Sequence, residues 1–182
     1  MDEKRQVKVS KYLSRALRHQ PERLGIALDP AGWADIGELL AACAARGFEV
    51  TRAELDLVVE RSDKQRFALS EDGLRIRANQ GHTVAVELGL PPADPPEELF
   101  HGTAGRVVDT ILAEGLKAMD RHDVHLSPDA DTARRVGARR GRPVVLVVES
   151  GRMHRDGHVF RVSANGVWLV AAVPAEYVRR ES

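Results

Sequence analysis

Arginine and histidine side chains gather at three places in the sequence, where together they could bind a phosphate and move a proton. Arg18 and His19 are adjacent at the end of a predicted helix. A guanidinium group matches the oxygens of a phosphate, and an imidazole exchanges its proton near neutral pH. Taken singly, each cluster also has an ordinary structural explanation as a solvated helix face, a hairpin or a turn. The other two clusters are Asp63–Arg66 with Arg75, Arg77, Gln80, Gly81 and His82, and Phe100–Thr103 with His125–Ser127 and Val136–Arg139.

Other common catalytic motifs are absent from the sequence. It contains no P-loop, no G-x-G-x-x-G after a strand and no C-x-x-C. Its seven histidines form neither H-E-x-x-H nor a cysteine–histidine cluster with zinc spacing, so no metal is expected. The acidic residues are scattered over helix faces, which does not favour a pair of carboxylates for glycoside chemistry.

The composition is that of a globular protein with one large domain or two small ones. The 182 residues are 43% hydrophobic, and 27 basic residues balance 27 acidic ones. The charged start MDEKRQVKVS lacks the apolar region of a signal peptide, and no apolar run reaches the roughly 20 residues of a membrane span. The single cysteine, Cys43, is interpreted as a core residue, which fits a reducing cytoplasm. Arginine outnumbers lysine 22 to 5, and either phosphate recognition or the base composition of the gene explains this excess.

The helix that carries Arg18 and His19 is predicted within the stretch Val9–Trp33. Ser10 is its expected N-cap, and Gln20-Pro21 must end it, because proline lacks the N–H and restricts the residue before it. The helix is expected to bury an apolar face and to present a basic stripe on the opposite one. These two faces hold Val9, Leu13, Ala16 and Leu17, and Lys11, Arg15 and Arg18.

Two more helices and a hairpin are predicted in the first half of the chain. Thr51 and Glu54 form the pattern of a capping box, which opens the third helix. The order of three helices and a hairpin is that of a winged helix-turn-helix, an architecture that commonly binds nucleic acids. The predicted elements are helices at Asp35–Arg46 and from Thr51, and β-prone runs at Arg66–Ser70 and Leu74–Ala78.

A proline-rich stretch, Leu88–Leu99, divides the sequence. It holds four of the nine prolines, which exclude a regular helix or a central strand. We interpret it as a linker between a first domain, residues 1–90, and a second domain, residues 91–182, so the fold class is predicted to be α+β with two lobes. The unbroken apolar run Pro143–Val148 predicts a strand covered on both faces. The other elements expected in the second domain are helices at Arg106–Leu112 and Thr132–Arg140 and strands at Leu99–Gly102, Val124–Leu126, Val159–Val162 and Val167–Val173.

Taken together and in order, these motifs resemble one family, the NAD-dependent RNA 2′-phosphotransferases, which remove the splice-junction 2′-phosphate from ligated tRNA. The similarity runs from about Val9 to about Tyr177. Its most specific pieces are SKYLSRALRHQPERLGIALDPAGW, RANQGHT, FHGT, HDVHLS and VGARRGRPVVL. The resemblance implies an N-terminal winged-helix lobe that binds RNA and a C-terminal lobe of the ADP-ribosyltransferase fold that binds NAD.

The resemblance also implies roles for individual residues. The family's catalytic Arg-His-Arg-Arg set falls on Arg18, His19, Arg66 and Arg139, with Arg140 as the alternative to Arg139. The NAD-binding motifs fall on His101, Gly102, Thr103, His125, Leu126, Ser127 and Gly137. The candidates for contacting RNA near the phosphate, with packing of the hairpin as the alternative, are Arg77, Gln80 and His82.

The reaction implied by the family has two steps and uses NAD as a co-substrate without a metal. An internal RNA 2′-phosphate first attacks the nicotinamide-ribose C1″ of NAD, which releases nicotinamide and forms an RNA-2′-phospho-ADP-ribose intermediate. The ribose O2″ then attacks the new phosphodiester, which gives 2′-OH RNA and ADP-ribose 1″,2″-cyclic phosphate. Arginines suit the charge that builds on the phosphoryl oxygens, and histidine suits the proton needed by the departing oxygen.

Two other functions stay open at this point. The chain could ADP-ribosylate terminal phosphates of RNA or DNA and stop after the first step. It could instead be a non-catalytic winged-helix regulator whose second lobe senses a nucleotide, although the helix at Thr51–Arg61 is as acidic as it is basic. The partners expected from the sequence are RNA with an internal 2′-phosphate and NAD, in the cytoplasm, with no membrane or protein partner implied.

Overall fold

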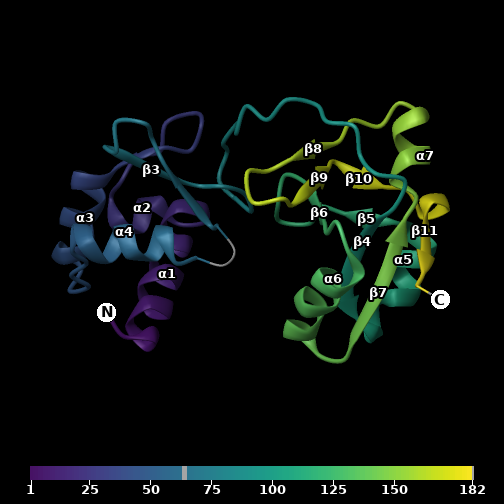
Figure 1. Ribbon diagram of the computed structural model, residues 1–182, viewed down its shortest axis with the longest axis horizontal. Coiled ribbons are helices and arrows are strands. Elements are labelled where there is room, and N and C mark those ends of the chain that lie inside the picture. The colour runs from purple at the N-terminus through teal and green to yellow at the C-terminus, as the bar shows by residue number, and fades with distance from the viewer. Residues whose placement is uncertain (63–64, 182) are drawn as a thin grey trace. The chain divides into compact units, whose positions relative to one another are not determined.

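Helices and small antiparallel sheets make up the chain, in a computed structural model that describes residues 1–62 and 65–181 and only the backbone of Arg140 (Figure 1). This mixture confirms the predicted α+β class. The chain divides into two compact units, Met1–Gly89 and Leu90–Ser182. Asp63 and Lys64 of the predicted polar cluster lie outside the described residues, as does the side chain of Arg140. Among the described residues, no helix combines the length and the apolar character that crossing a membrane needs.

Helix α1, Glu3–Arg18, begins about two turns earlier than the sequence predicts. Its N-cap is Asp2, whose carboxylate accepts the backbone N–H of Arg5 at 2.7 Å. The expectation that Ser10 is the N-cap is wrong, because Ser10 lies inside the helix and is buried. The residues before it are mostly polar, so they lack the apolar periodicity that marks a helix in a sequence.

The apolar face and the end of α1 are as predicted. Leu13 and Leu17 have no exposed surface, whereas Lys11 on the other side is exposed. The last helical residue is Arg18, and His19 is the C-cap. Burial of one face therefore orients the basic residues of α1 away from the core.

The rest of the first unit consists of short helices and a small sheet. The capping box at Thr51 and Glu54 is present, as predicted. The hairpin β2–β3 is confirmed, and β1 pairs with the other edge of β3. Neither α2 nor β1 was predicted, because each is too short to show a periodic pattern. The elements are α2 (Pro21–Leu24), β1 (Ala34–Asp35), α3 (Ile36–Ala45), α4 (Arg52–Glu60), β2 (Phe67–Leu69) and β3 (Arg75–Ala78).

Packing and an ion pair join α1 to α4. Leu55 of α4 belongs to the same buried cluster as Leu13 and Leu17 of α1. Nearer the start of α1, Arg5 donates to both carboxylate oxygens of Glu54 at 2.9 and 3.1 Å. The hydrogen bond from Arg5 lowers the pKa of Glu54. These contacts fix α1 against the start of α4.

The proline-rich stretch is neither a helix nor a regular strand, as predicted, but most of it is not a free linker. The backbone N–H of Ala93 donates to the carbonyl of Phe160 at 2.9 Å. The Ser150 hydroxyl donates to the carbonyl of Pro96 at 2.7 Å. From Ala93 onward the stretch is therefore part of the second unit.

The second unit is built from small antiparallel sheets with helices beside them. Strand β7, Pro143–Val148, lies between β4, Leu99–Ala104, and β11, Val178–Arg180 (Figure 1). The last four residues of β7 are buried, which confirms the predicted covered strand. The remaining elements are η1 (Gly105–Val107), α5 (Val108–Glu114), β5 (Leu116–Lys117), β6 (Val124–Leu126), α6 (Ala130–Gly137), η2 (Ala138–Arg140), α7 (Ser150–Arg155), β8 (Arg161–Val162), β9 (Trp168–Val170), β10 (Ala172–Val173) and η3 (Ala175–Tyr177).

Several predicted elements of the second unit differ from the structure. Strand β8 covers only the last two residues of the strand predicted over Val159–Val162, and the helix predicted over Arg106–Leu112 is divided between η1 and α5. The strand predicted over Val167–Val173 is split into β9 and β10, which belong to different sheets. The helix predicted over Thr132–Arg140 begins earlier, after the N-cap Asp129, and finishes as the 3₁₀ turn η2. Hydrophobic periodicity cannot place such breaks, because the apolar pattern continues across them.

Candidate active site

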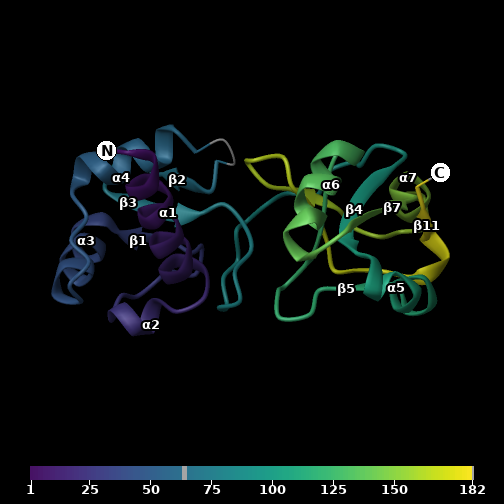
Figure 2. The ribbon, with the colours of Figure 1, turned by 90° about the horizontal axis from the view of Figure 1, so that it is seen from below.

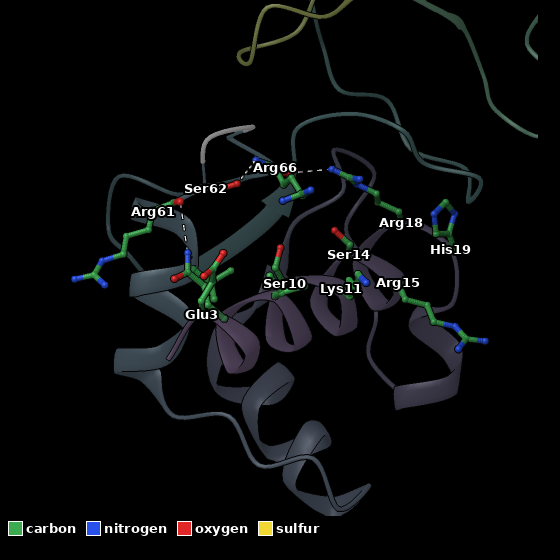
Figure 3. Close-up of a pocket in the computed structure, with 13 residues that line it drawn as sticks. Glu3, Ser10, Lys11, Ser14, Arg15, Arg18, His19, Arg61, Ser62 and Arg66 are labelled. Carbon is green, nitrogen blue, oxygen red and sulfur yellow. Dashed lines mark hydrogen bonds between the residues drawn. The ribbon is translucent and has the colours of Figure 1, made fainter. Parts of the chain in front are cut away.

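A groove of about 540 Å³ runs along α1 in the first unit (Figure 3). It is lined by three of the predicted catalytic residues, Arg18, His19 and Arg66. Its volume lies within the roughly 300–1,000 Å³ of typical ligand sites. The other lining residues come from α1, from α4 and from the segment after it, and they are Glu3, Gln6, Val7, Ser10, Lys11, Ser14, Arg15, Val58, Arg61 and Ser62.

Hydrogen bonds to the backbone of Arg66 hold this residue beside Arg18. The Nη2 of Arg18 donates to the carbonyl of Arg66 at 3.4 Å. The same carbonyl accepts the backbone N–H of Asn79 at 3.0 Å, and the N–H of Arg66 donates to Ser62 Oγ at 3.3 Å. Arg66 therefore stands at the start of the hairpin, with its guanidinium at the same groove as that of Arg18 (Figure 3). Two guanidinium groups on one groove are suited to bind a phosphate.

Thr83 positions His19, a role that the sequence did not assign. The backbone N–H of Thr83 donates to the carbonyl of Arg18 at 2.9 Å. The Thr83 Oγ1 lies 3.1 Å from Nδ1 of His19 and 3.4 Å from the carbonyl of Arg18. When the hydroxyl donates to that carbonyl, it accepts the Nδ1 proton of His19, and the chemistry of the ring is left to Nε2. The signal in the sequence was the motif RANQGHT, which ends at Thr83.

The three residues predicted to contact RNA near the phosphate do not line this groove. The Arg77 guanidinium lies over the ring of Trp33, 4.6 Å from its centroid. His82 is 3% exposed and lies against Gly32, and Gln80 is half-buried. The structure places Arg77 and His82 in packing contacts within the first unit. Their role in RNA binding stays a prediction.

The two predicted NAD-binding motifs lie side by side in the second unit. Phe100 and Ser127 exchange backbone hydrogen bonds at 2.9 and 2.7 Å. The Nδ1 of His101 donates to the carbonyl of His125 at 3.1 Å, so the neutral ring of His101 has its acceptor at Nε2. The Nδ1 of His125 lies 2.9 Å from Nη1 of Arg121, which only donates, so His125 carries its proton at Nε2. The two motifs thus combine a hydrogen-bond acceptor, Nε2 of His101, with a hydrogen-bond donor, Nε2 of His125.

Gly102 and Gly137 allow α6 to approach β4 closely (Figure 2). A Cβ on Gly102 would lie 1.7 Å from the carbonyl oxygen of Ala133, and a Cβ on Gly137 would lie 2.9 Å from the nitrogen of Thr103. No side chain fits at Gly102 without moving the backbone of α6. Arg139 follows α6 directly in η2 and is exposed, so this contact also determines where Arg139 stands.

The remaining members of the two motifs differ in exposure. Leu126 is 1% exposed and Thr103 is 5% exposed, so their side chains belong to the interior behind the motifs. His101, His125 and Ser127 are half-buried. A ligand at this place can therefore reach the histidines and the serine, whereas the other two residues support them.

Comparison with known proteins identifies the class to which such a chain belongs. The model of the family described as RNA 2′-phosphotransferase, Tpt1/KptA family, matches residues 4–172. A probable RNA 2′-phosphotransferase from Streptomyces griseus is 63% identical, and the match covers 98% of each chain. Proteins of the same description are 53% identical in Nostoc punctiforme, over 99% of each chain, and 54% identical in Burkholderia pseudomallei, over 94% of each. The chain belongs to the RNA 2′-phosphotransferase family, which confirms the resemblance seen in its motifs.

Proposed function

We propose that this chain transfers an internal 2′-phosphate from RNA to NAD. The products are 2′-OH RNA, ADP-ribose 1″,2″-cyclic phosphate and nicotinamide. The observation that carries this proposal is the groove where Arg18, His19 and Arg66 meet, in a chain of the RNA 2′-phosphotransferase family. Two guanidinium groups and an imidazole supply the charge stabilisation and the proton that release of a phosphate from a ribose oxygen requires.

In this proposal the first unit is the RNA-binding domain that the sequence predicted over residues 1–90. The succession of α1, α3, α4 and the hairpin β2–β3 supports a winged-helix arrangement. Arg18 and Arg66 bind the 2′-phosphate, which is an anion and attacks C1″ without losing a proton. In the second step the ribose O2″ loses its proton to water and bonds to phosphorus, the bond from phosphorus to the RNA O2′ breaks, and His19 gives O2′ its proton.

The second unit is the domain predicted over residues 91–182, and it binds NAD in an ADP-ribosyltransferase-like fold. Its residues fit such a ligand, because the acceptor of His101 and the donor of His125 match ribose hydroxyl groups, and Ser127 adds a hydroxyl. When bound, NAD supplies the C1″ electrophile and the nicotinamide leaving group. Arg139, in the exposed turn η2, binds phosphate oxygens near C1″ and so holds the reacting groups together in the first step.

Product analysis by mass spectrometry tests the proposal. The chain is incubated with NAD and a short RNA that carries one internal 2′-phosphate, and the same RNA without this phosphate is the control. The expected products are RNA that has lost its 2′-phosphate, ADP-ribose 1″,2″-cyclic phosphate and nicotinamide. The control RNA should give none of them. RNA that keeps ADP-ribose as its final product would support the phosphate-capping alternative, and tight RNA binding without turnover would support a regulator.

A further inference from the structure

We propose that the α1 groove, beyond the catalytic residues, holds the RNA strand next to the 2′-phosphate, with Ser14 and Lys11 contacting the backbone of a flanking nucleotide. This inference rests on the proposed function and extends it. The proposed function concerns the transfer of the 2′-phosphate, whereas this inference says where the RNA strand on either side of that phosphate binds.

The groove is longer than a single phosphate requires. It continues from Arg18 past Ser14 and Ser10 to Glu3 at the start of α1. Because an α-helix rises about 1.5 Å per residue, Lys11 and Arg18 are about 10 Å apart along its axis. A strand in a stacked duplex rises roughly 3.4 Å per nucleotide along its axis, so on that scale the distance spans about three nucleotides. The groove therefore has room for nucleotides beside the one that carries the 2′-phosphate.

Ser14 brings a polar group without a partner into this groove. Its Oγ is buried and makes no hydrogen bond to any of the described residues. Ser10, Ser14 and Arg18 are spaced by four, so they share one side of α1. Figure 3 shows the hydroxyl oxygens of Ser10 and Ser14 on the side of the helix nearer to Arg66. Buried hydroxyls normally have a partner, and beside two guanidinium groups the matching partner is an oxygen of an anionic ligand.

The charge of the groove also favours a nucleic acid strand. Lys11 and Arg15 border it from α1, and Glu3, at its far end, is the only carboxylate among the described lining residues. Lys11 is exposed and makes no ion pair within the described part of the chain. Positively charged grooves that follow the backbone are the general way in which proteins bind single-stranded nucleic acids.

The hairpin β2–β3 is less suited to bind the RNA strand, because the arginines of β3 already contact other residues of the first unit. Arg75 pairs with Asp29 at 3.5 Å, and Arg77 stacks on Trp33. A strand bound there would have to break these contacts. Along α1, by contrast, Lys11 and the hydroxyl of Ser14 bind a strand without losing a described partner.

The test compares the affinity of the full-length chain for two ligands in the absence of NAD. One is a single-stranded RNA tetramer with one internal 2′-phosphate, and the other is a nucleoside 2′-phosphate, which lacks flanking nucleotides. Ser14→Ala and Lys11→Ala are measured by fluorescence anisotropy, directly for the tetramer and by competition for the nucleotide. Lys4→Ala is the control, because Lys4 is exposed on the same helix and does not line the groove.

Ser14→Ala and Lys11→Ala are each expected to weaken binding of the tetramer about tenfold, and to weaken binding of the nucleotide clearly less. Lys11→Ala should also reduce the slope of log affinity against log salt concentration by about 0.7, the value for one contact with a single strand. Lys4→Ala should change neither the two affinities nor the salt slope. Equal losses for both ligands, or unchanged tetramer binding with an unchanged salt slope, would overturn the inference. Turnover of the wild type with NAD tests the proposed function separately, because these affinities are measured without NAD.

Discussion

Among single residues, Thr83 decides how the imidazole of His19 can be used. Its backbone N–H donates to the carbonyl of Arg18, the last residue of α1. Its Oγ1 contacts the Nδ1 of His19. A histidine held at Nδ1 has a defined tautomer and ring orientation, which a general acid needs. Thr83 thus acts through His19 and is a positioning residue.

Thr83→Val keeps the shape of the side chain and removes its hydroxyl. We expect the second step to slow about 10- to 100-fold while the first step changes little, because only the second uses the proton of His19. Rates of the two steps in single turnovers, measured against pH, provide the readout. Thr83→Ser restores the hydroxyl and should recover most of the rate. Equal slowing of both steps would show that Thr83 only supports the fold.

Sequence reasoning found the residues with distinctive chemistry but not those that position them. Arg18, His19 and Arg66 were predicted from the family resemblance of the motifs that hold them, and the structure brings them to one groove. The contact of Thr83 with His19 joins positions 64 residues apart, and no local pattern encodes such a distance. Sequence reasoning likewise did not single out Ser14, because a serine inside a helix is an ordinary polar residue until the groove around it is known.

Among the elements, α1 and α6 have the greatest effect on the two candidate sites. Helix α1 carries Arg18 and His19 and one long side of the groove, and its start is held by the pair Arg5–Glu54. Helix α6 leads into η2, and its distance from β4 is set by two glycines. Periodicity predicted both helices, but neither contact could be predicted, because each depends on a partner from a separate element.

Glu54→Gln is expected to destabilise the first unit by about 1 kcal/mol at pH 7. Because the pKa of Glu54 is lowered from its ordinary value of 4.5, the ionised carboxylate stabilises the folded state above that pH. The stabilisation is lost as the pH falls through the lowered pKa, so the difference between variant and wild type should shrink toward zero there. Urea unfolding at several pH values measures it, with Glu22→Gln in α2 as the control. A difference that stays constant with pH would contradict the role of the ion pair.

Gly102→Ala is expected to cost about 3 kcal/mol or more of unfolding free energy, because its Cβ would lie 1.7 Å from a carbonyl oxygen of α6. Gly105→Ala is a matched control just beyond β4, since a Cβ there meets only Val144 Cγ2 at 3.7 Å. Urea unfolding of the two variants provides the comparison. Equal stability of Gly102→Ala and Gly105→Ala would show that α6 does not approach β4 in this way.

For the whole molecule, each unit has its own buried cluster. One cluster holds Leu39, Leu55 and Ile76 of the first unit, and the other holds Phe160 and Met153 of the second. The proline content of the chain was the signal from which a boundary near residue 90 was predicted, because proline excludes regular structure. It could not show that the carbonyl of Pro96 accepts a hydrogen bond from the Ser150 hydroxyl, since that depends on a residue far along the sequence.

A fragment of residues 1–89 is expected to fold by itself, because the buried cluster of the first unit is complete within it. Dispersed amide signals in NMR and one cooperative urea transition are the expected observations. The fragment should also bind the 2′-phosphorylated tetramer, since it contains the whole groove. A fragment without cooperative unfolding would contradict the division into two domains.

A time course of RNA species formed by His19→Ala tests the central proposal, that the groove at the end of α1 completes the transfer of the 2′-phosphate. The RNA with one internal 2′-phosphate is incubated with NAD, and substrate, ADP-ribosylated intermediate and dephosphorylated product are separated by gel mobility. His19→Ala should accumulate RNA-2′-phospho-ADP-ribose, with its breakdown slowed about 10²–10⁴-fold, and Arg139→Ala should slow formation of this intermediate instead. Release of dephosphorylated RNA by His19→Ala at nearly the wild-type rate, with no intermediate, would contradict the proposal and leave His19 only the C-cap of its helix.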